Sequence, residues 1–129
     1  MDEITLWTLI AKGENENVDF KRELNLNSAD EKAEFIKDVI ALANSASDAG
    51  YLIVGVDDSK LCIGINALEQ EKIQQIAYTY IEPAVQLRTE LVSVSSPAQL
   101  LIGLIQVEKS FRPHKVARAI GRKRLFYLY

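Results

Sequence analysis

The sequence has little of the side-chain chemistry that secreted proteins and many enzymes depend on. It contains one cysteine, Cys62, and one histidine, His114. An internal disulfide is therefore excluded, and so is a zinc site built from clustered cysteines and histidines. A lone cysteine fits the reducing cytoplasm. The sequence predicts that Cys62, between two apolar residues, is a small core or turn residue and not a nucleophile.

Long hydrophobic runs and the familiar phosphate-binding motifs are also missing. No apolar run approaches the roughly 20 residues that a membrane span requires, so no membrane partner is expected. The acidic start Met1-Asp2-Glu3 is unlike a secretory signal or a transit peptide. The chain has no conventional phosphate loop, no Gly-x-Gly-x-x-Gly and no Gly-x-Ser-x-Gly. These absences predict a cytoplasmic protein outside several common enzyme classes.

What the sequence does have is a strong asymmetry of charge. Residues 109–129 carry seven Lys and Arg and no Asp or Glu, whereas residues 1–108 carry eight basic and eighteen acidic residues. Such asymmetry predicts a patch that meets an anion. The alternative is a basic tail that only complements an acidic body.

Hydrophobic periodicity and turn residues predict one α+β domain over residues 1–129, with a mixed β-sheet and about three helices. The predicted helices are residues 4–10, stopped by Gly13; residues 28–44, begun by a Ser28–Glu31 capping box; and residues 67–81, ended near Pro83. The predicted strands are residues 18–24, 51–56, 61–65, 85–94, 100–107, 116–120 and 125–129. Of these, 51–56 is expected to be buried on both faces. Because the chain stops on an apolar strand, we expect the natural protein to continue.

A set of carboxylates forms the first candidate site. Glu14 and Glu16 precede the first predicted strand, Asp19 lies on its polar face, and Asp57 and Asp58 follow the central strand. If the two strands are neighbours, these acids converge. Converging carboxylates bind Mg²⁺ or Mn²⁺, and such ions activate water for phosphodiester cleavage. The alternative is that Asp-Asp-Ser-Lys is ordinary turn chemistry and that the strand acids are solvated.

A phosphate-binding surface forms the second candidate site. Lys21 and Arg22 are adjacent on the first predicted strand and so point to opposite faces. Further basic residues, with Phe111, Phe126 and Tyr127 among them, recur along the last segment of the chain: Arg112, His114, Lys115, Arg118, Arg122, Lys123 and Arg124. Such a segment could track a nucleic-acid backbone and stack on bases. The alternative is a solvated hairpin whose aromatic side chains belong to the core.

Three stretches of the sequence resemble one family. Residues 14–22 resemble its opening E-x-x-x-x-E-F-K-R. Residues 40–45 together with 50–58 resemble its A-x-A-N-x-x-G-G-x-L-x-x-G-V-x-D block. Residues 112–114 and 125–127 look like its basic-Pro-aromatic turn and its terminal strand. On these motifs the chain is identified as a member of the Schlafen-type AlbA-like domain family over nearly its whole length.

The resemblance implies a mixed α+β domain that binds DNA or structured RNA, within a bacterial transcriptional regulator or a defence protein. No cofactor is implied for binding, and a homodimer is a further expectation. In some animal Schlafens the domain is a ribonuclease that cuts structured RNA with three carboxylates and a divalent ion. Those carboxylates fall here on Glu14, Asp19 and Asp57, so the alternative function is an endoribonuclease that depends on Mg²⁺ or Mn²⁺.

Two departures from the family pattern bear on this alternative. Asp19 stands where the family has Glu, which sets that carboxylate back by about a bond and argues against cleavage. The Gly-Gly turn is replaced by the longer loop of residues 46–50, which leaves the central strand itself intact. A third reading, a protein-interaction or dimerisation domain, rests on the acidic body of the chain.

Overall fold

The structure is a computed structural model of the chain and describes residues 1–45, 49–95, 98–109 and 113–120. The described elements are, in order, α1 (Glu3–Lys12), β1 (Val18–Lys21), α2 (Ala29–Asn44), β2 (Gly50–Val54), α3 (Gln70–Tyr80), β3 (Ile81–Glu82), β4 (Leu87–Val94), β5 (Leu100–Val107) and β6 (Lys115–Val116). The predicted α+β class is confirmed. None of the described helices is both long and apolar enough to cross a membrane.

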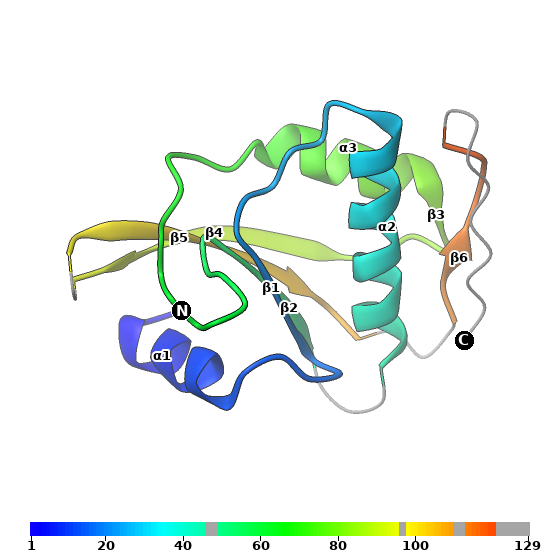
Figure 1. The fold of residues 1–129 in the computed structure, drawn as a ribbon. Coiled ribbons are helices and arrows are strands. Elements are labelled where there is room, and N and C mark those ends of the chain that lie inside the picture. The colour runs from blue at the N-terminus through cyan, green and yellow to red at the C-terminus, as the bar shows by residue number, and fades with distance from the viewer. Residues whose placement is uncertain (46–48, 96–97, 110–112, 121–129) are drawn as a thin grey trace.

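A mixed four-stranded sheet is the centre of the fold, with the strand order β1-β2-β5-β4. β1 and β2 are parallel, whereas β2 with β5 and β5 with β4 are antiparallel. Helices α2 and α3 lie on one face of the sheet and α1 lies on the other (Figure 1). The short strands β3 and β6 form a separate antiparallel pair at the end of the molecule beside α2 and α3. β1 and β4 are therefore the two edges of the main sheet.

Two apolar clusters hold the sheet between its helices. One includes buried residues of α2, α3 and β2, with Leu52 and Val54 from the strand. The other joins Leu6 and Ile10 of α1 to the opposite face, to which β2 contributes Ile53. Consecutive residues of β2 thus enter different clusters, which confirms the prediction of a strand buried on both faces. Cys62 is also buried, at 7% exposure, and belongs to the α1 cluster, as predicted.

Local signals fix the first two helices as expected. The Ser28 hydroxyl accepts the Glu31 backbone N–H at 3.1 Å, and a Glu31 carboxylate oxygen accepts the Ser28 backbone N–H at 3.1 Å. This reciprocal capping box satisfies two donors that the first turn of α2 leaves unpaired. At the end of α1, Gly13 has φ +80°, a conformation that L side chains rarely adopt, and its N–H bonds to the Ile10 carbonyl.

The structure corrects several predicted boundaries. β1 ends at Lys21 and not at residue 24, because the Lys21 carbonyl accepts both the Gly55 N–H at 2.7 Å and the Val56 N–H at 3.2 Å. The ladder stops at this doubled contact, and Leu24 turns to the α2 and α3 cluster. Residues 61–65 are not a strand; Val56 and Cys62 form only an isolated bridge.

The later elements are shorter than predicted, and one lies outside the described residues. α3 begins at Gln70 and not at residue 67, and the strand expected at 116–120 is the two-residue β6. The strands β4 and β5 match their predicted positions closely. The predicted strand 125–129, like the tip of the predicted hairpin at 96–97, lies outside the described residues.

Candidate functional site

The first two predicted strands are neighbours, as the convergence of the acids required. β1 pairs with β2 in parallel, with Asp19 opposite Leu52 and Lys21 opposite Val54. Val18 and Phe20 enter the α1 cluster, so Asp19 and Lys21 face the side of the sheet that α2 covers. Because of this alternation, the charged side chains of Asp19 and Lys21 on the edge strand β1 point toward α2.

Lys21 is held between two carboxylates. Its ammonium lies 2.7 Å from Asp38 Oδ2 on α2 and 3.4 Å from Asp19 Oδ2 on its own strand. Burial alone would lower the pKa of Lys21, but the hydrogen bond and charge of Asp38, and then Asp19, outweigh it and raise that pKa. Burial also raises the pKa of Asp38, against the opposing effect of Lys21. The predicted phosphate contact Lys21 is thus a fixed cation inside an acidic pair.

Glu14 and Asp19 are brought together. Burial, followed by a hydrogen bond with the Glu14 carboxyl group and repulsion by its charge, raises the pKa of Asp19 to about 6, although Lys21 opposes the shift. Asp19 therefore holds a proton more readily than a solvated aspartate does, with the Glu14 carboxyl group beside it. The arrangement is a carboxyl pair with a lysine beside it, at the start of the edge strand β1.

Asp57 is occupied by its own turn. Asp57 Oδ1 accepts the Ser59 hydroxyl at 2.7 Å, the Ser59 N–H at 2.9 Å and the Leu61 N–H at 3.0 Å. The Ser59 hydroxyl and then the Leu61 N–H lower the pKa of Asp57. Among the described residues, no group of three or more His, Cys, Asp or Glu side chains is placed to hold a metal ion. The structure therefore gathers Glu14 and Asp19, and Asp57 does not join them.

The described part of the basic tail lies beside α3. β6 pairs with β3, with Lys115 opposite Glu82, and the Lys115 ammonium lies 3.5 Å from Glu82 Oε1. Both Lys115 and Arg118 are exposed. Arg22 is exposed too, and its charge contributes to the lowered pKa of Asp57. The candidates Arg112, Arg122, Lys123 and Arg124, and the aromatic residues Phe111, Phe126 and Tyr127, lie outside the described residues.

His114 is fully buried, at 0% exposure. Its Nδ1 lies 2.6 Å from the Pro83 carbonyl oxygen. Its backbone N–H donates to Asn44 Oδ1 at 2.8 Å, and its backbone carbonyl accepts from Asn44 Nδ2 at 3.0 Å. The sequence grouped His114 with the phosphate contacts, but here its ring packs inside the molecule and anchors the chain just before β6.

Sequence reasoning missed the roles of Asp38 and Asn44. Asp38 lies next to the apolar stripe of α2. An acidic residue beside buried positions indicates a basic partner in the same half-buried environment, and this signal was available in the sequence. Asn44 belongs to the Ala-Asn stretch that the resemblance rests on, but nothing near it in the sequence indicated its partner, which is 70 residues away. Each residue ties α2 to a segment that carries candidate site residues.

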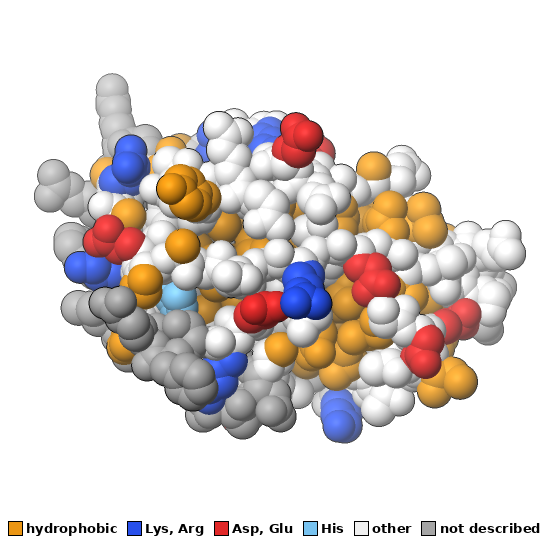
Figure 2. Space-filling view, turned by 180° about the vertical axis from the view of Figure 1, so that it is seen from behind, with side chains coloured by type: hydrophobic (Ala, Val, Ile, Leu, Met, Phe, Trp, Pro, Cys, Tyr) orange, Lys and Arg blue, Asp and Glu red, His pale blue; other side chains and the backbone are white. Residues whose placement is uncertain are grey.

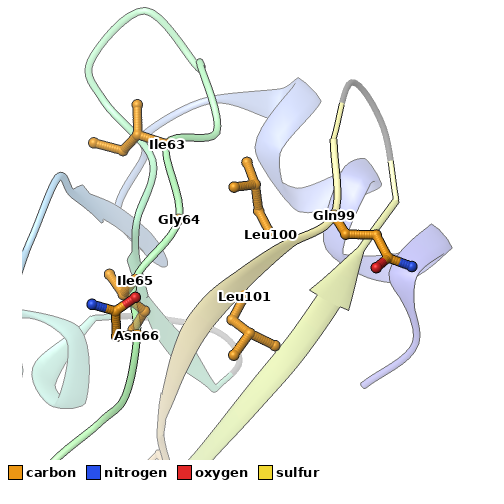
Figure 3. A pocket seen from close by; sticks show the side chains of 7 residues that line it. All are labelled: Ile63, Gly64, Ile65, Asn66, Gln99, Leu100 and Leu101. Carbon is orange, nitrogen blue, oxygen red and sulfur yellow. The ribbon is translucent and has the colours of Figure 1, made fainter.

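Two hollows on the surface differ in what lines them. One of about 380 Å³ lies between residues 63–66 and the start of β5, and Figure 3 shows Leu100 and Leu101 of β5 beside the Ile63 to Asn66 stretch. It carries no ionisable side chain and none of the predicted site residues. The other, of about 220 Å³, is lined by Lys21 and Asp38 together with Glu23, Glu31 and Glu34. Of these two hollows, the acidic one adjoins the candidate site.

Comparison with known proteins agrees with this α+β fold and its motifs. Residues 14–127 match the family described as Schlafen, AlbA_2. The chain belongs to that family. A search of the curated proteins found no match.

Among solved structures, the chain is similar to the DIP2311 protein from Corynebacterium diphtheriae, with a TM-score of 0.58 and 19% sequence identity. The match covers 90% of this chain and 23% of that one, so the chain spans about a quarter of the length of that protein. At this identity the likeness concerns the fold alone.

Proposed function

We propose that the domain binds DNA or structured RNA through its basic segment, residues 109–124. One observation carries the proposal: exposed Lys115 and Arg118 lie on a stretch that the β3–β6 pair and the Asn44 contacts fix to the body. The whole segment holds seven Lys and Arg and no Asp or Glu. Two fixed cations, Lys115 and Arg118, within such a basic segment and against an otherwise acidic body favour a polyanion that approaches from one side.

The contacts of such a surface are with phosphates. The Lys115–Glu82 pair is exposed on both sides, so it costs little to exchange Glu82 for a phosphate oxygen. Phosphate contacts position a nucleic acid and carry little sequence information. Membership of the Schlafen, AlbA_2 family supports a role in a bacterial transcriptional regulator or a defence protein, in which this domain works beside others. Binding of this kind requires no cofactor.

A salt titration tests the proposal. Fluorescence anisotropy of the domain with a labelled DNA duplex and with an RNA hairpin, between about 50 and 200 mM KCl, should show affinity that falls steeply with salt, since bound phosphates release counterions. Absence of binding at the lowest salt, or affinity that does not change with salt, would contradict the proposal. The comparison of the two ligands also decides between DNA and RNA.

A second candidate function, a metal-dependent endoribonuclease, is favoured by the Glu14–Asp19 pair. The Glu14 and Asp19 carboxyl groups lie together and the pKa of Asp19 is raised, so a divalent cation bound by both would relieve the repulsion between them. Mg²⁺ is often held by only one or two carboxylates together with substrate phosphates and waters, so this pair fits a role as ligands. The ion would supply an activated water, and Lys21 would hold Asp19 in place.

Cleavage of tRNA in the presence of Mn²⁺ distinguishes the two functions. Cleavage that disappears in Asp19→Asn and in Glu14→Gln would support the enzyme. RNA that is bound but remains intact would support a binding module. Calorimetric titration with Mn²⁺ alone compares the metal affinity of the wild-type domain with that of Glu14→Gln. This measurement reports on the carboxyl pair without any need for turnover.

A further inference from the structure

The outer edge of β4 is a long, regular strand edge. β4 has eight residues and ends the sheet order, and no strand of the described part of the chain pairs with its outer side. Its pairing with β5 is continuous from Leu87 opposite Val107 to Val94 opposite Leu100, without a bulge. Neither a proline nor a bulge protects this edge, although natural sheets commonly use both against edge-to-edge pairing.

The register identifies the residues whose backbone faces outward. The Glu108 N–H donates to the Gln86 carbonyl at 3.0 Å, next to the first pair of the ladder. In an antiparallel ladder the hydrogen-bonded residues alternate, so the even-numbered residues of β4 bond to β5. The odd-numbered residues therefore direct both N–H and C=O away from β5: Leu87, Thr89, Leu91 and Ser93. Of these groups, the Leu87 carbonyl already accepts the Gln74 side-chain amide at 2.9 Å.

The charges along this edge are self-complementary about Thr89. Arg88 and Glu90 flank Thr89 and lie on the same face of the strand. When the strand is paired with an antiparallel copy of itself so that Thr89 faces Thr89, each Arg88 lies opposite Glu90 of the other copy. Leu87 then lies opposite Leu91, and Leu91 is 42% exposed in the single chain. A two-fold axis at Glu90 would instead place Glu90 against Glu90 and Arg88 against Val92, without any Arg88–Glu90 pair.

The existing ion pairs leave room for this contact. Arg88 is 74% exposed and uses its Nε toward Glu108 at 2.9 Å, so its two terminal amino groups are available. Glu90 is 43% exposed and binds the N-terminal ammonium at 2.7 Å. A carboxylate accepts up to about four hydrogen bonds. Viewed from behind, the side on which β4 forms the sheet edge shows acidic and basic side chains interspersed, without a field of one sign (Figure 2).

We propose that two copies of this chain associate by antiparallel pairing of β4 about a two-fold axis at Thr89, which forms a continuous eight-stranded sheet. The outward groups of Leu87, Thr89 and Leu91 form the backbone hydrogen bonds, and the two Arg88–Glu90 pairs set the register. The Leu87 carbonyl, which accepts from Gln74, uses its second lone pair for this contact. Thr89 against Thr89 is also a favourable cross-strand pair. A second copy is the occupant because the charge pattern complements itself, which a strand of a different sequence would match only by chance.

Sedimentation velocity of the whole chain tests the proposal. The wild-type protein should form a concentration-dependent species of twice the 14.5 kDa mass of one chain. Thr89→Pro removes an outward N–H without touching the β5 ladder, so it should give a folded monomer, whereas Thr89→Ser should remain a dimer. Circular dichroism of both variants confirms the fold. A wild-type chain that stays monomeric, or a Thr89→Pro variant that still dimerises, would overturn the proposal.

Charge reversal tests the register itself. Arg88→Glu and Glu90→Arg each place like charges opposite one another in the homodimer, so each should raise the dissociation constant by about tenfold or more. Mixed together, the two variants are complementary at both positions and should form a one-to-one heterodimer. This is expected although Arg88→Glu lacks the ion pair with Glu108 and Glu90→Arg lacks the ion pair with the N-terminal ammonium. Failure of the mixture to associate while the wild type dimerises would assign the dimer to another surface.

Discussion

The side-chain amide of Asn44, the last residue of α2, bonds both backbone polar groups of His114: Nδ2 donates to the carbonyl at 3.0 Å, and Oδ1 accepts the N–H at 2.8 Å. This bidentate contact joins the end of the longest helix to the chain immediately before β6. The exposed cations Lys115 and Arg118 follow within four residues. Asn44 is therefore a positioning residue for the basic segment in the proposed function.

Loss of the Asn44 amide should loosen the segment that carries the cations. Asn44→Ala leaves the His114 N–H and carbonyl without partners, which should lower the free energy of unfolding by about 1–3 kcal/mol. The measurement is urea unfolding, with hydrogen exchange of the His114 amide as the local readout.

Asn44→Asp provides the matched comparison. It keeps the acceptor for the His114 N–H but sets a carboxylate oxygen against the His114 carbonyl, so it should also be destabilising. If Asn44→Ala exchanges at the His114 amide no faster than the wild type, the contact does not anchor the segment.

The raised pKa of Asp19 predicts a dependence of stability on pH. Between the ordinary pKa of 3.8 and the folded value of about 6, the folded protein binds more protons at Asp19 than the unfolded chain does. Stability from this group is therefore present at low pH and declines as pH rises through that window. Asp38, whose pKa is also raised, acts in the same direction.

Asp19→Asn should flatten this decline. The free energy of unfolding measured in urea at pH about 4 and pH about 6.5 should differ less in Asp19→Asn than in the wild type. Asp58→Asn, which replaces an exposed acid in the turn after β2, should leave this difference in the free energy of unfolding unchanged. An unchanged pH dependence in Asp19→Asn would mean that Asp19 is not the group that binds the proton.

Gly55 is predicted to tolerate no side chain. It has φ +104°, and a Cβ there would lie 3.2 Å from the backbone of Gly64. Gly55→Ala should destabilise the domain by about 1–3 kcal/mol, because left-handed backbone is strained for Ala and Gly64 cannot easily move away. Thermal unfolding measures this change, and the exposed Asp58→Ala serves as control. A melting temperature equal to that of the wild type would contradict the prediction.

The sequence predicts those parts of the fold whose signals are local. The Ser28–Glu31 capping box and the apolar stripe of α2 identify that helix at both ends, since both lie within the helix itself. The apolar run of β2 indicates a central strand for the same reason. The strand predicted to reach Leu24 fails because its end is set by the Lys21 carbonyl meeting Gly55 and Val56, a contact between distant segments.

The candidate site follows the same division. Glu14 and Asp19 could be paired in advance because the motif that contains both residues spans a single turn and strand. Asp38 and Asn44 could not, because their partners depend on how α2 lies across β1 and against the chain before β6. Burial of His114 was missed for a similar reason: a basic stretch indicates exposure, and only the packing beside Pro83 shows that one member turns inward.

The measurement that tests the central claim most directly is the salt dependence of nucleic-acid binding by Lys115→Ala/Arg118→Ala. Each phosphate contact removed should reduce the slope of log affinity against log salt by about 1, so the double variant should lose about 2 from the wild-type slope and bind more weakly at low salt. Lys12→Ala, an exposed cation at the end of α1, should keep the wild-type slope. A double variant with the slope and affinity of the wild type would contradict the account, since it would place the phosphate contacts elsewhere.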